Sequence, residues 1–197
     1  MIDRFKKLVE DYRLYSSVTN ISSISRRYFV IGFFDGVLTV LGMIMGAHLS
    51  GEASSTLIIT AGIATALALG ISSGWGAFEA ERIEQLIIKR EKEKAMLKNV
   101  KGCAIDKAHE FATMISSIVH GIAPIPAAII PLIPYVFFPL NQAFYLALAF
   151  GLSSLFVVGA FLGKISKTNL IVAGLRMVIA GLVTLIVVTV LSPSHFI

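Results

Sequence analysis

The chain has 197 residues, of which 56% are hydrophobic and only 15% charged, and its formal net charge is +5. Soluble domains carry about 25% charged residues, and the mean hydropathy of this chain is +0.82. The composition excludes an ordinary soluble domain and indicates an integral membrane protein. The basic balance therefore requires no nucleic-acid partner. The single cysteine, Cys103, excludes an internal disulfide.

Residues 1–27 form a polar and charged N-terminal segment without the apolar core of a cleavable signal peptide. Within it, Ile2, Phe5, Val9 and Tyr12 recur at near-helical spacing among lysines and arginines. This pattern is typical of a helix that lies on an anionic membrane surface. A solvated leader is the alternative interpretation.

Five apolar runs follow, each close to the roughly 20 residues that a membrane-spanning helix needs. They are Tyr28–Leu49, Thr56–Phe78, Phe111–Phe138, Gln142–Leu162 and Leu170–Leu191. The third is the longest and contains four prolines, so we expect it to tilt or kink. The sequence therefore predicts an all-α integral membrane protein, with residues 28–197 as one domain of five transmembrane helices.

Lysines and arginines show how these spans are oriented. They concentrate before the first span, between spans two and three, and between spans four and five. Because cytoplasmic loops carry this excess, we expect the N-terminus in the cytoplasm and the C-terminus outside. Residues 79–110 then form a cytoplasmic helical insert, and the second helix extends into the cytoplasm to about Val100.

Asp35 lies inside the first apolar run, where an unpaired carboxylate costs several kcal/mol. Its position predicts an ion or proton site. His120, Arg176 and two serine pairs fall at a similar depth, roughly 9–14 Å from the cytoplasmic surface at about 1.5 Å per residue. The serines are Ser72, Ser73, Ser153 and Ser154.

This layer predicts a polar site in the inner half of the bundle, but each member also has a structural interpretation. Serines in membrane helices often bond to their own helix or tighten packing. His120 could be a satisfied core histidine. Asp35 and Arg176 could neutralise each other as an ion pair. Met43, deeper in the first span, is either a soft metal ligand or a core filler.

Acidic and histidine side chains gather in the cytoplasmic insert. The candidates for metal capture are Glu79, Glu81, Glu84, Glu91, His109 and Glu110. Carboxylates and imidazole suit Fe²⁺ and Mn²⁺ arriving from the cytosol. The alternative is a solvated helix with partial charge pairing, since neither Glu-x-x-His nor Cys-x-x-Cys is present.

Several segments together resemble the vacuolar iron transporter family, whose members import iron and manganese into the vacuole, and its prokaryotic relatives. They are Asp35-Gly36, the small-residue second span that continues into a charged helix, Pro131-Leu132-Ile133-Pro134-Tyr135, Leu155-Phe156, Gly159 and Gly163-Lys164. The predicted order and topology of the five spans also agree. The resemblance covers most of the chain from about Tyr28 to Leu191.

The resemblance implies a homodimer that exports Fe²⁺ or Mn²⁺ from the cytosol in exchange for protons. Asp35 would bind or relay the ion, and the cytoplasmic acids would collect it. Apart from the resemblance, His120 could be a second ligand or a proton relay, and Ser73 is a further candidate on the path. The chain departs from the family at Ser73 and Ala77, where methionine and glutamate are usual. No permanently bound cofactor is implied, and Co²⁺ or Zn²⁺ would suit similar ligands.

The predicted protein is a multi-pass membrane protein, in the cell membrane of a prokaryote or the vacuolar membrane of a eukaryote. Its partners are divalent metal ions, protons and the lipid bilayer. We expect no enzyme, because the sequence contains no zinc-protease motif and no Gly-x-Ser-x-Gly. The alternative function is a non-transporting assembly or sensor module in which Asp35 and Arg176 form a structural ion pair.

Overall fold

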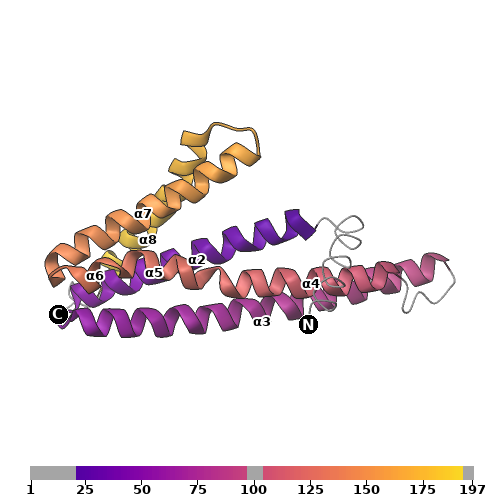
Figure 1. Cartoon of the computed structure of the whole chain (residues 1–197), viewed down its shortest axis with the longest axis horizontal. Helices are drawn as coiled ribbons and strands as arrows, with labels where there is room; N and C mark the ends of the chain where they lie inside the picture. Colours follow the sequence, from indigo (N-terminus) through magenta and orange to yellow (C-terminus); the bar gives the residue numbers. More distant parts are fainter. Residues whose placement is uncertain (1–20, 97–103, 193–197) are drawn as a thin grey trace, which may run out of the picture. The chain divides into compact units, whose positions relative to one another are not determined.

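The computed structural model describes residues 21–96 and 104–192, and over these ranges it contains helices and no strand. The helices, labelled in Figure 1, are α2 (Ile21–Leu49), α3 (Ser55–Met96), α4 (Ala104–Ile122), α5 (Pro124–Leu132), α6 (Pro134–Phe137), α7 (Leu140–Ile165) and α8 (Leu170–Leu191). Five helical segments are long and apolar enough to cross a membrane. The expected all-α membrane fold is confirmed, while the orientation of the termini remains a prediction.

Several helices reach beyond the predicted spans, and α2 and α3 are the clearest cases. α2 begins at Ile21 rather than at Tyr28, because polar and charged residues end an apolar run without ending a helix. α3 is a single helix of 42 residues, so the second span does continue into the charged insert. The chain turn expected at Lys101-Gly102 and the amphipathic pattern in residues 1–20 lie outside the described residues.

The third predicted span is divided into α4, α5 and α6, as its prolines predict. Pro124 and Pro134 each occupy the start of a helix, where a missing N–H group removes no helical hydrogen bond. Pro131 lies inside α5 and cannot donate to the carbonyl group of Ala127, one turn earlier. Interruptions of this kind are tolerated in membrane helices when neighbouring groups satisfy the backbone.

The chain separates into two compact units. Unit 1 comprises Met1–Phe29 and Ile71–Ile122, so it holds the start of α2, the charged half of α3, and α4. Unit 2 comprises Val30–Gly70 and Ala123–Ile197, and it holds the rest of α2 and α3 together with α5 to α8.

Small residues bring α3 and α4 together in unit 1. A Cβ atom on Gly74 would lie 3.1 Å from the Cα atom of Gly121 and 3.3 Å from the carbonyl oxygen of Ser117. Ser116 and Ser117 are buried, and both hydroxyls donate to the carbonyl oxygen of Thr113, at 3.0 and 2.6 Å. These two buried hydroxyls of α4 are thus satisfied within the helix itself.

The core of unit 2 lies around α2. Its largest fully buried side chains include Leu41 and Ile44 of α2, Ile58 of α3 and Leu155 of α7. Within this unit α7 packs along α8 and against α5 and α6, and Figure 1 shows α7 and α8 lying side by side. Gly151 of α7 gives Leu41 its space, since a Cβ atom there would lie 2.7 Å from the Leu41 side chain.

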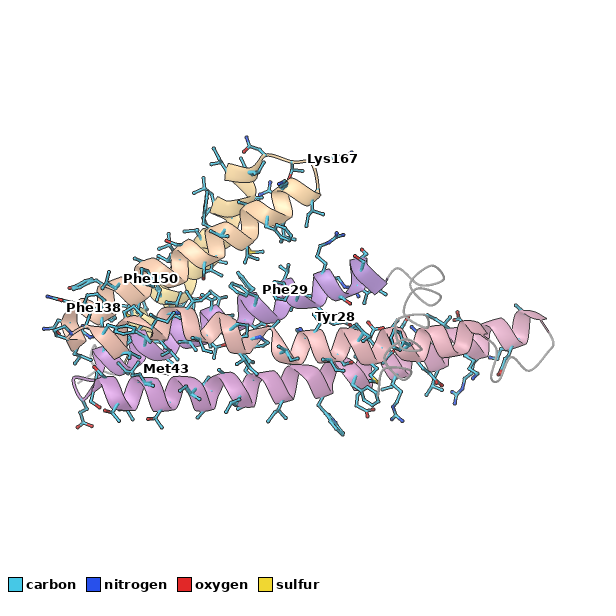
Figure 2. All side chains as sticks on the ribbon, viewed as in Figure 1. Tyr28, Phe29, Met43, Phe138, Phe150 and Lys167 are labelled. Atoms are coloured by element: carbon cyan, nitrogen blue, oxygen red, sulfur yellow. The ribbon has the colours of Figure 1, made fainter. Side chains whose placement is uncertain are left out.

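The turn between α7 and α8 is defined by local backbone chemistry. Lys167, labelled at this turn in Figure 2, has a φ of 54°, and Thr168 N–H donates to the Gly163 carbonyl oxygen at 2.9 Å. This is the Schellman arrangement that commonly ends a helix. Asn169 then caps α8, because its side-chain oxygen accepts from the N–H groups of Ile171 and Val172.

Candidate functional site

Asp35 lies on α2 within unit 2, where its side chain is half-buried. The next residue, Gly36, is buried and touches the start of α5. A Cβ atom on Gly36 would lie 2.6 Å from the carbonyl oxygen and 2.8 Å from the Cα atom of Pro124. Only glycine permits such a close backbone approach, so the Asp35-Gly36 pair joins the carboxylate to a tight contact between α2 and α5.

Other predicted site residues of unit 2 show mostly structural roles. Met43, labelled in Figure 2, packs against a buried cluster that contains Ile44 and Tyr135, which favours the core-filler interpretation. Ser154 donates to the carbonyl oxygen of Gly151 in its own helix at 2.7 Å.

The predicted pairing of Asp35 with Arg176 stays a prediction. Arg176 is exposed on α8. The ion pairs Arg27–Glu81 and Arg82–Glu79, found within the described part of the chain, do not include it.

Tyr28 of α2 is the centre of a polar cluster in unit 1. Its hydroxyl donates to Glu81 Oε1 of α3 at 2.5 Å. Its backbone carbonyl oxygen lies 2.9 Å from Nδ1 of His120 on α4, so that ring nitrogen must carry the proton for a hydrogen bond to form. The two rings are tilted, with centroids 5.2 Å apart. Tyr28 therefore joins three helices at one point.

Arg27 completes this cluster, which we call the Tyr28 cluster and define as Arg27, Tyr28, Glu81 and His120. The Arg27 guanidinium group lies 3.8 Å from Glu81 Oε1 and 5.3 Å from the centroid of the Tyr28 ring. The Glu81 side chain is 16% exposed, whereas that of Arg27 is 64% exposed. One carboxylate oxygen thus accepts a hydrogen bond from a hydroxyl and lies near a largely exposed cation.

The remaining acids of the insert are mostly solvated. Glu79 is held by Arg82, whose Nε and Nη2 atoms donate to Glu79 Oε2 at 3.1 and 2.8 Å. The exposed carboxylates are Glu84, Glu91 and Glu110. The side chain of His109 lies outside the described residues. Among the side chains that the structure describes, no three histidine, cysteine or acidic groups converge as a metal site, so joint metal capture remains a prediction.

The predicted polar layer is distributed over both units. Asp35 and Arg176 belong to unit 2, whereas Ser73 and His120 belong to unit 1. Ser73 is half-buried on α3. Whether these groups meet stays a prediction, while the contact of His120 with Tyr28 supports its interpretation as a hydrogen-bonded histidine.

Comparison with known proteins decides the family. The model of the VIT family matches residues 26–99 and 79–192. The chain belongs to the VIT family. An uncharacterized protein of Methanocaldococcus jannaschii is 38% identical over 159 residues, which cover 79% of this chain and 82% of that protein. The resemblance inferred from Asp35-Gly36 and the proline-rich third span is thereby confirmed.

VIT-family membership and the five apolar helices together identify a multi-pass membrane protein of a metal-ion transport family. The expectation of a transporter rather than an enzyme agrees with this. Family membership alone does not identify the ion, the direction of its movement or its coupling to protons.

Two residues of this VIT-family chain escaped the sequence reasoning, namely Arg27 and Tyr28. The signal was available, because successive spans joined by a short turn run antiparallel. The N-terminal end of the first span at Tyr28 must then face the C-terminal end of the second, just after Phe78, where Glu81 lies. The acidic pattern of the insert alone shows Glu81 only as one member of a charged helix and does not reveal its partner on α2.

Proposed function

We propose that this protein carries a divalent transition-metal ion, Fe²⁺ or Mn²⁺, out of the cytosol in exchange for protons. The observation that supports this most directly is Asp35, a half-buried carboxylate in the middle of an apolar membrane-spanning helix. A carboxylate in that environment is costly unless a cation or a proton neutralises it. Alternate binding of metal and proton at one carboxylate is the simplest basis for exchange.

Family membership supports the metal, and the chemistry of the available ligands limits its type. Carboxylate and imidazole groups suit Fe²⁺ and Mn²⁺, and also accept Co²⁺ and Zn²⁺. A cytoplasmic N-terminus and a homodimer belong to the same proposal. The archaeal relative favours the cell membrane as the site of action.

The proposal is tested with purified protein in liposomes, by following Mn²⁺ or Fe²⁺ uptake together with a proton-sensitive dye. We expect Asp35→Ala and Asp35→Asn to abolish metal-dependent proton movement while the protein stays folded. Glu52→Gln, which removes an exposed carboxylate from the turn after α2, is the matched control and should transport normally.

Full transport by both Asp35 variants would overturn the proposal. If wild-type protein moves no metal, and if Asp35→Asn destabilises it while exchange of the Asp35 and Arg176 charges restores stability, the structural ion pair becomes the better interpretation. The two outcomes differ in transport and in thermal stability, so they cannot be confused.

A further inference from the structure

The Tyr28 cluster lies where the apolar part of α3 gives way to its charged extension. Among the insert acids whose contacts are described, Glu81 differs from the exposed Glu84, Glu91 and Glu110, since its side chain is mostly buried and bonded to another helix. A cation moving along α3 from the exposed acids would meet Glu81 before Glu79, which lies two residues nearer the apolar part and is already bonded to Arg82. The burial of Glu81 makes its occupancy by a positive charge favourable.

We infer that Glu81 is a cation-receiving carboxylate of the cytoplasmic side, that Tyr28 positions it, and that Arg27 is a tethered competitor for the incoming metal. This inference rests on the proposed function. Arg27 then raises the metal concentration needed for transport, and Tyr28 lowers it.

Tyr28 acts as a positioning residue through its two hydrogen bonds. The hydroxyl orients Glu81 Oε1, while the bond from His120 to the Tyr28 carbonyl oxygen ties this part of α2 to α4. A second group that orients a ligating carboxylate typically raises metal affinity about 10- to 100-fold. Loss of the hydroxyl should therefore weaken metal capture without removing the carboxylate.

Arg27 acts in the opposite direction. Its guanidinium group lies 3.8 Å from Glu81 Oε1 and remains largely exposed, so the pair is easily broken by a stronger cation. Exposed ion pairs contribute little free energy, and a divalent ion gains more from the same carboxylate than a hydrated guanidinium group does. Arg27 therefore neutralises Glu81 when metal is scarce and yields to metal when it is abundant.

The experiment compares Arg27→Gln with Arg26→Gln in liposomes under a proton gradient, with Mn²⁺ as the probe. Both variants remove one positive charge from the same turn of α2, and no contact of Arg26 with Glu81 occurs among the described residues. We expect Arg27→Gln to lower the half-saturating Mn²⁺ concentration about two- to fivefold relative to Arg26→Gln. The maximal rate should change little.

Two further variants separate positioning from simple structural support. Tyr28→Phe keeps the ring and the backbone bond to His120, and it should raise the half-saturating Mn²⁺ concentration about tenfold. In the Glu81→Gln background, Arg27→Gln should no longer differ from Arg26→Gln. A purely structural ion pair would instead make Arg27→Gln less stable and no better at low metal.

Equal half-saturating concentrations for Arg27→Gln and Arg26→Gln, in protein that transports Mn²⁺ normally, would overturn the inference and leave the proposed function intact. Absence of Mn²⁺, Fe²⁺, Co²⁺ and Zn²⁺ flux in wild-type protein would instead reject the proposed function.

Discussion

Gly36→Ala places one methyl group in a close contact between α2 and α5 within unit 2. The new Cβ atom would lie 2.6 Å from the carbonyl oxygen of Pro124 and 3.0 Å from the Cβ atom of Ala127. Close carbon–oxygen contacts in proteins begin near about 3.3 Å, so the two helices would have to separate by roughly 0.7 Å. Overpacking of this kind costs about 1–3 kcal/mol.

Gly46→Ala is the matched control, because Gly46 lies on the same helix and a Cβ atom there meets nothing within 4 Å. Both substitutions gain a similar helix propensity, up to about 1 kcal/mol, which cancels in the comparison. The remaining difference of about 1–3 kcal/mol corresponds to a Tm lower by about 2–12 °C for Gly36→Ala in a chain of this length.

Thermal unfolding of the detergent-solubilised variants measures this difference, and Mn²⁺ transport in liposomes measures its effect on function. We expect Gly36→Ala to transport poorly even at temperatures where it is folded, because the shift of α2 displaces Asp35. If Gly36→Ala and Gly46→Ala unfold at the same temperature and transport equally, the close approach of α2 to Pro124 has no role in forming the site.

Two further substitutions test local packing and capping. Gly74→Ala brings a Cβ atom to 3.1 Å from the Cα atom of Gly121, whereas a Cβ atom in the control Gly76→Ala meets nothing within 4 Å. The Tm of Gly74→Ala should therefore be a few degrees lower than that of Gly76→Ala, at roughly 2–4 °C per kcal/mol. Equal Tm values would contradict the contact between Gly74 and Gly121. Asn169→Ala removes the side-chain cap of α8 and should cost about 0.5–2 kcal/mol, whereas Asn169→Ser should retain most of the stability. Identical unfolding of the two Asn169 variants would show that the cap contributes nothing.

Hydropathy predicted the spans well because apolar side chains favour the membrane interior and polar side chains favour water. The fifth span, Leu170–Leu191, coincides with α8, because Asn169 is both the polar residue just before the apolar run and the N-cap of the helix. The start of α2 at Ile21 was missed. A polar stretch can continue a helix into water, and only the backbone reveals it.

The candidate site was predicted in part, for a physical reason. Asp35 stands out in sequence because a carboxylate conflicts with its apolar neighbours. The Pro124 contact of Gly36 and the Tyr28–Glu81 bond depend on how separate helices are aligned along their axes. Residue spacing within one helix carries no information about that alignment, so it cannot identify the partner of Glu81 on another helix.

The length of α3 places some of its charged residues outside the membrane, where ionic strength rather than membrane voltage acts on them. A helix of 42 residues is about 63 Å long, roughly twice the hydrocarbon thickness of about 30 Å, so close to half of it extends beyond the bilayer core. Charges on that half are screened by salt over about 8 Å and do not feel the transmembrane voltage. Under the proposed function, a cation at Asp35 would lie within that voltage, at about 2.3 kcal/mol per charge for each 100 mV crossed. Capture of the ion should accordingly respond to ionic strength, whereas its passage across the membrane should respond to membrane potential.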